Sequence, residues 1–457
     1  MIGAGYVGLT TGTCLAELGH DVCCCDIDTD RIDSIARGHL PIYEQGLAGL
    51  IANNQNRRRL SFSSDVEASV SMADIVIIAV GTPSMDNGSI DLSFVEQAAR
   101  DIARFVKPGA VVVIKSTVVA GTARRIRAVM EAERGESVAV ASNPEFLREG
   151  SAISDFMNTD RIIVGVDDKL SAQMLAALYA PLVQKNIPYV QTTTENAELI
   201  KYAANAFLAL KIGFINEVAN LCEATGGDVS AVARGIGLDK RIGPAFLAVG
   251  PGFGGSCFPK DTRAFAAIGR RFGATQSLVE TLIARNEDRK RHLAERILSA
   301  LAQRCKGPAA PRVAVLGAAF KANTDDIREA AALTIIPLLV KAGIRVAVHD
   351  PQARSTAERH LKDVIWHASA YEAAKDADLV VILTEWEEYA TLDLKRMSSL
   401  MRGDGIIDYR NIFDGEAVTR CGLHYISLGR PPAAPAARKL RAGKGRGNLS
   451  DIAASPA

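Results

Sequence analysis

The stretch GAGYVG (residues 3–8) decides the fold of the N-terminal half, because it fits the pattern GxGxxG. The pattern alone is weak, but here it opens a helical stretch (residues 9–19), and a candidate strand, DVCCCD, follows. Asp26 closes that strand, 18 residues after Gly8. In this setting glycines let a pyrophosphate approach a helix N-terminus, and the acid bonds the ribose hydroxyls of an adenosine. We therefore predict a Rossmann-like domain that binds NAD, since an acid disfavours the 2′-phosphate of NADP.

The strand that should precede this motif is almost missing, because only Met1 and Ile2 stand before Gly3. Loss of about four buried apolar residues would cost several kcal/mol, which is comparable with the stability of a whole domain. We therefore expect a truncated first strand in this chain and a true start upstream of Met1.

Further along the chain, short β-branched runs alternate with helical stretches, and the alternation restarts after the linker KGPAAP (residues 306–311). Residues 192–224 form the longest helical pattern, without a proline. In each half a helix ends at a glycine, a strand follows, and an acid closes that strand, Asp26 in the first half and Asp350 in the second. These patterns predict an α/β protein with two Rossmann-like, doubly wound parallel-sheet domains, joined by a long central helix and a helical middle domain. The expected boundaries are 1–191 for the NAD-binding domain, 192–305 for the central helical domain, 306–429 for the second nucleotide-binding domain and 430–457 for a disordered tail.

The composition excludes several classes of function. The 457 residues predict roughly two or three domains. The net charge of +1 gives no electrostatic argument for binding nucleic acid or a membrane surface. No apolar run reaches the roughly 20 residues that span a bilayer, and no secretory signal begins the chain, so we expect a cytoplasmic protein. The eight cysteines form neither CxxC pairs nor a disulfide-like framework, and we expect no metal site.

One cysteine lies in a setting suited to chemistry, the stretch GPGFGGSCFPKD (residues 250–261). Oxidation of an alcohol with NAD needs no cysteine, but oxidation of an aldehyde to an acid does benefit from one. A thiolate adduct gives up hydride readily and leaves a thioester that water can cleave. Cys257 therefore suggests that the reaction proceeds to a carboxylate, and the alternative is a structural cysteine on a tight turn.

The neighbours of this thiol predict its properties. Pro259 suits the first turn of a helix, so Cys257 should lie near a helix N-terminus and beside Lys260. Such a thiol should have a lowered pKa. A substrate should be able to lie directly against the backbone of three glycines, Gly252, Gly254 and Gly255.

Ten motifs in order along residues 3–428 resemble the UDP-glucose/GDP-mannose dehydrogenase family: GAGYVGL, PIYEQGL, GTPS, KSTV, SNPEFLREG, ELIKYAANAFLALKIGFINE, RIGPAFL, GFGGSCFPKD, FKANTDDIRE and DYRN. The resemblance implies an NAD-dependent four-electron oxidation of UDP-glucose at the C6 alcohol, a UDP-sugar site in residues 306–429, and a homodimer built on the central domain. Alanines at 245, 248 and 322 and glycine at 213 depart from the family pattern, which puts the details of substrate grip in doubt.

The resemblance also implies a role for each site residue. The catalytic set is Cys257 as nucleophile, Lys201 and Asn205 holding the reacting oxygen, Asp261 for proton transfer, and Glu145 and Thr117 for the attacking water. The i, i+4 spacing of Lys201 and Asn205 supports their pairing independently. Substrate contacts are implied for Phe146, Leu147, Arg148, Lys201, Arg241 (reaching a neighbouring subunit), Gly254, Phe258, Lys321 and Arg410. Cofactor contacts are implied for Gly3, Gly5, Tyr6, Val7, Gly8, Asp26, Arg31, Thr82, Thr117, Glu149, Lys260 and Arg328.

Three other functions fit parts of the sequence. Oxidation of GDP-mannose would use the same chemistry on another nucleotide sugar. A simple 3-hydroxyacid dehydrogenase would share the first domain, but it would need neither Cys257 nor a second nucleotide domain. A non-catalytic nucleotide-sugar binder would follow if the truncated first strand had destroyed the NAD site.

Overall fold

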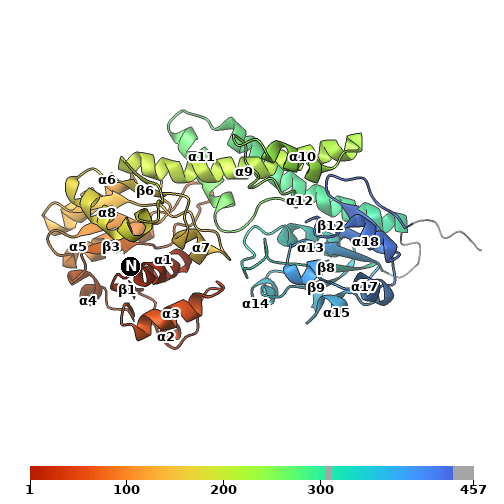
Figure 1. The fold of residues 1–457 in the computed structure, drawn as a ribbon, viewed down its shortest axis with the longest axis horizontal. Helices are drawn as coiled ribbons and strands as arrows, with labels where there is room; N and C mark the ends of the chain where they lie inside the picture. Colours follow the sequence, from red (N-terminus) through yellow and green to blue (C-terminus); the bar gives the residue numbers. More distant parts are fainter. Residues whose placement is uncertain (305–309, 436–457) are drawn as a thin grey trace, which may run out of the picture.

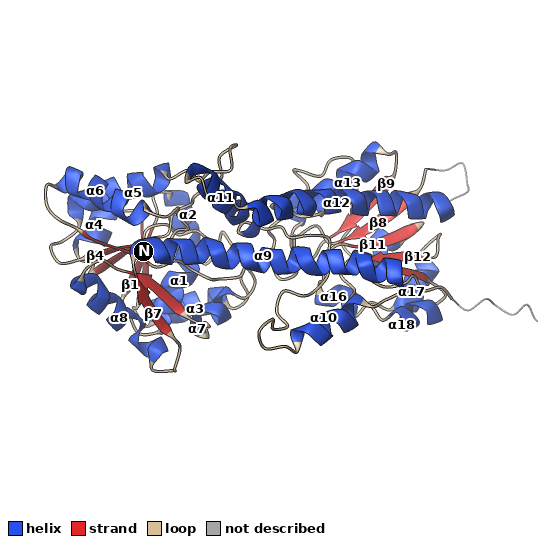
Figure 2. Ribbon diagram, turned by 90° about the horizontal axis from the view of Figure 1, so that it is seen from above, coloured by secondary structure: helices blue, strands red, loops and turns tan. Residues whose placement is uncertain are grey.

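The computed structural model describes residues 1–304 and 310–435, and it has an α/β domain at each end of an elongated molecule. The helix α9 (Thr194–Thr225) runs along the top of Figure 1 and connects the two domains, as the view from above in Figure 2 also shows. This architecture confirms the predicted fold class. The exact domain boundaries stay a prediction.

The N-terminal domain is built on a largely parallel sheet. Its strands are β1 (Val22–Cys25), β2 (Leu60–Ser63), β3 (Ile75–Ile78), β4 (Val111–Ile114), β5 (Ala139–Ser142), β6 (Ile162–Gly165) and β7 (Tyr189–Thr192). Strands β3 to β7 lie side by side in sequence order, and β1 pairs with β2. Its helices are α1 (Tyr6–Glu17), α2 (Thr29–Ala36), α3 (Leu47–Asn56), α4 (Val66–Ser71), α5 (Ser93–Phe105), α6 (Thr122–Arg134), α7 (Ala152–Met157) and α8 (Lys169–Val183).

The short segment before the glycine motif joins these two groups of strands. Ile2 forms parallel bridges to both Cys25 and Ile78. Its N–H donates to the carbonyl of Ile77 at 2.7 Å, and its own carbonyl accepts from Ala79 at 2.8 Å. Ile2 thus occupies the central position of the sheet and aims the chain into the turn that starts α1.

The C-terminal domain carries a second parallel sheet, in the order β10-β9-β8-β11-β12-β13. Its strands are β8 (Arg312–Leu316), β9 (Arg345–His349), β10 (Val364–Trp366), β11 (Leu379–Ile382), β12 (Gly405–Asp408) and β13 (His424–Ser427). Its helices are α13 (Ala332–Lys341), α14 (Arg354–Ala357), α15 (Ala370–Ala374), α16 (Glu387–Ala390), α17 (Leu394–Leu400) and α18 (Gly415–Arg420).

The weak internal repeat in the sequence corresponds to a structural one. Asp26 follows β1 and accepts the N–H of Ala4 at 2.7 Å. Asp350 follows β9 and accepts the N–H groups of Ala318 and Ala319 at 2.7 and 2.9 Å. In both domains an acid at the end of a strand therefore anchors the turn of the neighbouring segment, which is Ile2 in the first domain and β8 in the second.

The middle of the chain is helical, as predicted. After α9 come α10 (Val229–Gly237), α11 (Phe258–Arg271) and α12 (Ser277–Arg304). No helix in the described ranges is both long enough and apolar enough to cross a bilayer. Most of the predicted linker, residues 305–309, lies outside the described residues, and so do residues 436–457 of the predicted tail.

The first residues of the predicted disordered tail are ordered, which corrects the start of that segment. Arg430 pairs with Asp228 at 3.0 Å, and Ala433 bridges to Tyr425 of β13. These contacts hold the chain against the C-terminal sheet beyond the boundary at residue 429, because a carboxylate and a strand edge supply partners that composition does not reveal.

A buried acid on α9 ties this helix to the N-terminal domain. Glu198 accepts the N–H groups of Gly121 and Ala123 at 2.6 and 2.8 Å, and so it caps the N-terminus of α6. Burial raises the pKa of Glu198 to about 7, although both N–H groups act to lower it.

This raised pKa predicts a pH dependence of stability. The contribution of Glu198 to the unfolding free energy is fully present below its ordinary pKa of 4.5, and it is lost as the pH rises through about 7. In a Glu198→Gln variant we expect the fall in unfolding free energy between these pH values to shrink by about 3 kcal/mol, measured by denaturant titration. Glu195→Gln is the control, since Arg124 helps to hold the pKa of Glu195 below its usual range. If the unfolding free energies of wild type and Glu198→Gln changed with pH in parallel, the raised pKa of Glu198 would be contradicted.

Candidate active site

The glycine motif forms a turn that fits a dinucleotide. Gly3 has φ +99°, and a Cβ there would lie 2.6 Å from the carbonyl oxygen of Ala79. A Cβ at Gly8 would lie 1.9 Å from the carbonyl oxygen of Gly3. A Cβ at Gly5, the N-cap of α1, would meet no atom within 4 Å. The turn is therefore closed toward the protein and open at Gly5, where a pyrophosphate would approach the helix N-terminus beside Val7.

The predicted ribose acid is placed at the edge of this turn. Asp26 is buried, and its carboxylate accepts Arg31 at 2.9 Å as well as Ala4. Thr82 is buried in the segment after β3, and Thr117 is half-buried after β4. These residues all lie near the carboxyl edge of the N-terminal sheet, where ligands bind in Rossmann-like domains.

The hydroxyl of Tyr6 has a structural role that the sequence did not indicate. It donates a short hydrogen bond to Glu44 and accepts the N–H of Gly150 at 3.1 Å. Glu44 also accepts the N–H groups of Gly150 and Ala152, both at 2.8 Å. Burial, together with Glu44, raises the pKa of Tyr6. The side chain thus fixes the loop before α7, and a contact between Tyr6 and the cofactor stays a prediction.

The glycine-rich loop before Cys257 is held by α12. Asn286 accepts the N–H of Phe253 at 2.8 Å and donates to its carbonyl at 3.0 Å. A Cβ at Gly252, which has φ +119°, would lie 2.7 Å from the Asn286 oxygen. A Cβ at Gly254 would lie 2.6 Å from the carbonyl oxygen of Glu329. Protein atoms thus fill the space that side chains at these glycines would take, and the expectation that substrate lies against their backbone stays a prediction.

Cys257 is the half-buried N-cap residue of α11, as its position before Pro259 predicted. The prediction of a lowered pKa is wrong. Burial raises the pKa of Cys257 to about 11, and the charge of Glu145 adds to this, while Lys201 opposes it. Lys260 is turned away to Asp261, at 2.6 Å. Desolvation therefore outweighs the cations near this thiol.

The two predicted residues of α9 face the site together. Lys201 is buried and forms an ion pair with Glu145 at 2.9 Å. Asn205, one turn later, donates to Asp261 at 2.6 Å. The other oxygen of Asp261 accepts Lys260. The i, i+4 spacing thus brings an ammonium and an amide to carboxylates from two other segments.

The charges in this group influence one another strongly. Burial alone would lower the pKa of Lys201, but Glu145, Cys257 and Asp261 together raise it. Burial alone would raise the pKa of Glu145, but Lys201 and other partners hold it below its usual range. Both side chains are therefore ionised, and Cys257 lies within their electrostatic reach.

A second acid of the same loop connects the two α/β domains. Glu149 accepts Ser256 at 2.7 Å and Thr324 at 3.3 Å, and it pairs with Arg328 at 3.4 Å. Burial and the neighbouring Asp326 raise the pKa of Glu149 to about 7. The segment that carries Cys257 is thus hydrogen-bonded, through Ser256, to a contact between the domains.

The residues implied for the nucleotide sugar lie in several surroundings. Lys321 follows β8, and burial lowers its pKa. Arg410 follows β12 and donates to the carbonyls of Leu383 and Phe320 at 2.7 and 2.6 Å. Both lie at the carboxyl edge of the second sheet.

The remaining members of that set come from the middle of the chain and the loop after β5. Phe146 lies under Arg161, 3.9 Å from ring centroid to guanidinium, and Leu147 donates its N–H to Glu145. Arg148 pairs with Asp155 at 2.6 Å. Phe258 packs against Phe246 and Phe253 with centroid distances of 5.9 and 6.3 Å. Arg241 is 90% exposed and does not reach the site within its own chain.

Sequence reasoning missed Lys115, which is buried after β4 and donates to Asn143 at 3.0 Å. It also missed Asn286 and Glu44. Lys115 and Asn143 belong to the motifs KSTV and SNPEFLREG, so a lysine within an apolar strand pattern was the available signal. In the described ranges, no group of three or more His, Cys, Asp or Glu side chains could hold a metal ion.

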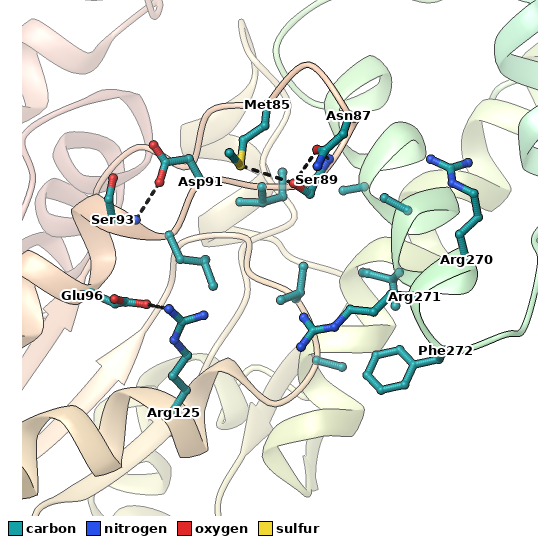
Figure 3. A pocket seen from close by; sticks show the side chains of 17 residues that line it. Met85, Asn87, Ser89, Asp91, Ser93, Glu96, Arg125, Arg270, Arg271 and Phe272 are labelled. Carbon is teal, nitrogen blue, oxygen red and sulfur yellow. Dashed lines mark hydrogen bonds and ion pairs between the residues drawn. The ribbon is translucent and has the colours of Figure 1, made fainter.

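A separate cavity of about 610 Å³ lies along the second half of α11. Figure 3 shows Arg271 pointing into it with Phe272 at its edge, and Arg125 paired with Glu96 across from them. None of the predicted site residues lines this cavity. Cys257 therefore lies outside this cavity, at the N-terminus of α11.

The open glycine turn, the buried Asp26 and the second α/β domain are the features of an NAD-dependent dehydrogenase. Three domain models of one family match the chain in order: the NAD binding domain at residues 1–183, the central domain at 195–288 and the UDP binding domain at 314–415. The chain belongs to the UDP-glucose/GDP-mannose dehydrogenase family, which confirms the resemblance, the enzyme class and the cofactor.

Individual relatives agree with this assignment. The UDP-glucose 6-dehydrogenase of Rhizobium meliloti is 46% identical over 94% of this chain and 99% of its own length. The UDP-glucose 6-dehydrogenase TuaD of Bacillus subtilis is 45% identical over 94% and 93%. A UDP-glucose dehydrogenase structure from Pyrobaculum islandicum superposes with a TM-score of 0.83 at 39% identity, covering 90% of this chain and 93% of that one.

Proposed function

We propose that this protein oxidises UDP-glucose to UDP-glucuronate with two NAD per sugar, through a thioester on Cys257. The observation that carries the proposal is the group of side chains around this thiol. Lys201, Glu145 and Asp261 are buried, ionisable and close enough to shift one another's pKa or that of Cys257. Such clusters of coupled groups are typical of catalytic sites.

The first oxidation needs a base and a cradle for the alcohol oxygen. NAD, when bound, accepts one hydride in each of the two oxidations. Asp261 takes the hydroxyl proton, directly or through water, while the Lys201 ammonium and the Asn205 amide stabilise the developing alkoxide. Loss of the hydride from C6 leaves an aldehyde held beside Cys257.

The second oxidation proceeds on the sulfur. Sγ of Cys257 bonds to the aldehyde carbon as the thiol proton leaves, and the oxygen becomes the hydroxyl of a thiohemiacetal. Loss of the second hydride and of that proton gives the thioester. Glu145, with Thr117 orienting the water, removes a proton from it as its oxygen attacks, and the C–S bond breaks to release the acid. The whole reaction adds one water, removes two hydrides and releases three protons.

The nucleotide end of the substrate is expected at the carboxyl edge of the C-terminal sheet. Lys321 and Arg410 follow β8 and β12 there, and this domain matches the UDP binding domain of the family. UDP-glucose is favoured over GDP-mannose because the relatives named above, at 39–46% identity, are UDP-glucose dehydrogenases.

The homodimer is proposed to form along α9. Phe207, Phe214 and Leu221 are spaced by seven residues on this helix and are 64%, 56% and 63% exposed. An apolar stripe of this kind on a helix surface favours burial against a second helix. Arg241, nearby in sequence and exposed, could then serve the site of the second subunit.

The number of NADH formed per sugar tests the reaction class. With UDP-glucose limiting and NAD in excess, we expect two NADH and one UDP-glucuronate per sugar, measured by absorbance at 340 nm and by anion-exchange chromatography. GDP-mannose at the same concentration is the specificity control. One NADH per sugar with release of an aldehyde would refute the four-electron oxidation, and turnover of GDP-mannose alone would refute the substrate.

A further inference from the structure

Lys115 is a buried cation without a charged partner in the part of the chain that the structure describes. It follows β4 and is 3% exposed. Its ammonium donates to the side-chain oxygen of Asn143 at 3.0 Å and to the Asn143 carbonyl at 3.4 Å. No carboxylate lies within ion-pair distance in those residues. A buried ammonium that donates to neutral acceptors alone is costly, which makes Lys115 a candidate for a functional role.

The position of this ammonium is fixed by its neighbours. Asn143 donates to the carbonyl of Ile163 at 2.8 Å, and its oxygen accepts the hydroxyl of Tyr179 as well as Lys115. The carboxamide therefore cannot turn without losing a buried hydrogen bond. Lys115 is held in place by β5, β6 and α8 at once.

The cation shares a cavity with the carboxylate proposed to activate water, beyond ion-pair distance from it. Lys115 and Glu145 line the same small cavity, of about 40 Å³, which has room for water. Glu145 and Lys115 each favour the charged form of the other, although burial lowers the pKa of Lys115 to about 8. A second cation, Lys201 of α9, forms the ion pair with Glu145.

In the proposed reaction the ammonium of Lys201 also stabilises the substrate oxygen, so it is shared between that oxygen and Glu145. The more Lys201 turns toward the substrate oxygen, the less it supports the negative charge of Glu145, which stays buried. An uncompensated buried carboxylate takes up a proton, and a protonated Glu145 cannot act as a base.

We propose that Lys115 is a positioning residue that keeps Glu145 ionised while Lys201 holds the substrate oxygen, and that it thereby sustains hydrolysis of the thioester. This inference rests on the proposed function. It assigns Lys115 no contact with the substrate. The titratable and charged groups around Glu145 are Lys115, Lys201, Cys257, Tyr179, Arg161 and Asp155.

The test is the pH profile of thioester hydrolysis in Lys115→Met. The protein is mixed with UDP-glucose and excess NAD in a single turnover, quenched in acid, and the acylated Cys257 peptide is quantified by mass spectrometry. We expect the acidic limb of the hydrolysis rate to move up by about one pH unit, which means about tenfold slower hydrolysis at pH values below the wild-type limb, with the first NADH formed at close to the wild-type rate. Lys107→Met is the control, because Lys107 forms an exposed pair with Asp74.

Two more variants separate charge from packing. Lys115→Arg keeps the charge and should restore the wild-type limb, whereas Lys115→Gln removes it and should shift the limb as Lys115→Met does. An unshifted limb in either neutral variant, or an equal shift in Lys115→Arg, overturns the inference. The proposed function fails separately, if no acylated Cys257 peptide forms in the wild-type protein.

Discussion

Replacement of Cys257 by serine is expected to reduce the release of UDP-glucuronate by roughly 10³-fold or more, since removal of a covalent nucleophile has effects of this size or larger. The serine hydroxyl is a much weaker nucleophile than a thiolate, so aldehyde oxidation should stall before free acid forms. The readouts are NADH and UDP-glucuronate in the same reaction. Cys421→Ser, which changes another half-buried free cysteine, should keep the wild-type rate. Equal acid production by wild type and Cys257→Ser would rule out covalent catalysis.

The state of this thiol in the free protein can be measured as well. Burial and Glu145 raise the pKa of Cys257 to about 11. Its alkylation by iodoacetamide should therefore keep rising with pH well above 9, because only the thiolate reacts. An alkylation rate that levels off near pH 7 would contradict this expectation. It would show that Cys257 is already a thiolate at neutral pH in the protein without substrate.

Replacement of Lys201 by methionine is expected to lower kcat/KM by ~10² to 10³-fold, the usual effect of losing one donor to a developing oxyanion. The variant should also lose ~3–5 kcal/mol of stability, because Glu145 is left buried without its ion-pair partner at 2.9 Å. Steady-state kinetics and denaturant titration measure the two losses. Lys211→Met is the control, since Lys211 lies on the same helix but donates to loop carbonyls, at 3.0 Å to Ile242.

A double variant tests the structural role of Lys201. Lys201→Met with Glu145→Gln removes both charges, so we expect most of the stability to return. Activity stays low because Glu145 is also proposed to act in the reaction, so recovery of activity together with stability would exclude a chemical role for both residues. A single variant that keeps kcat/KM within tenfold of wild type would exclude Lys201 from the chemistry.

Most of the fold could be predicted because it follows from patterns between residues that are close together in the sequence. The glycine turn and the acid of the first domain lie within one strand-helix-strand unit, so their spacing carries the geometry. The long helix was placed at residues 192–224 and is observed at Thr194–Thr225. The ordered residues after 429 could not be predicted, because Arg430 is held by Asp228, 202 residues earlier.

By itself, the sequence determined which residues could do chemistry and which would share a helix face. Spacing along a helix or turn is local geometry. It predicted that Lys201 and Asn205 share one face of α9, and that Cys257 lies at the start of α11. Only the tertiary structure decided their charges and partners. Glu145 reaches Lys201, and Asp261 reaches Asn205, each across 56 residues. Burial, which raises the pKa of Cys257 against the nearby cations, depends on every segment packed around the thiol.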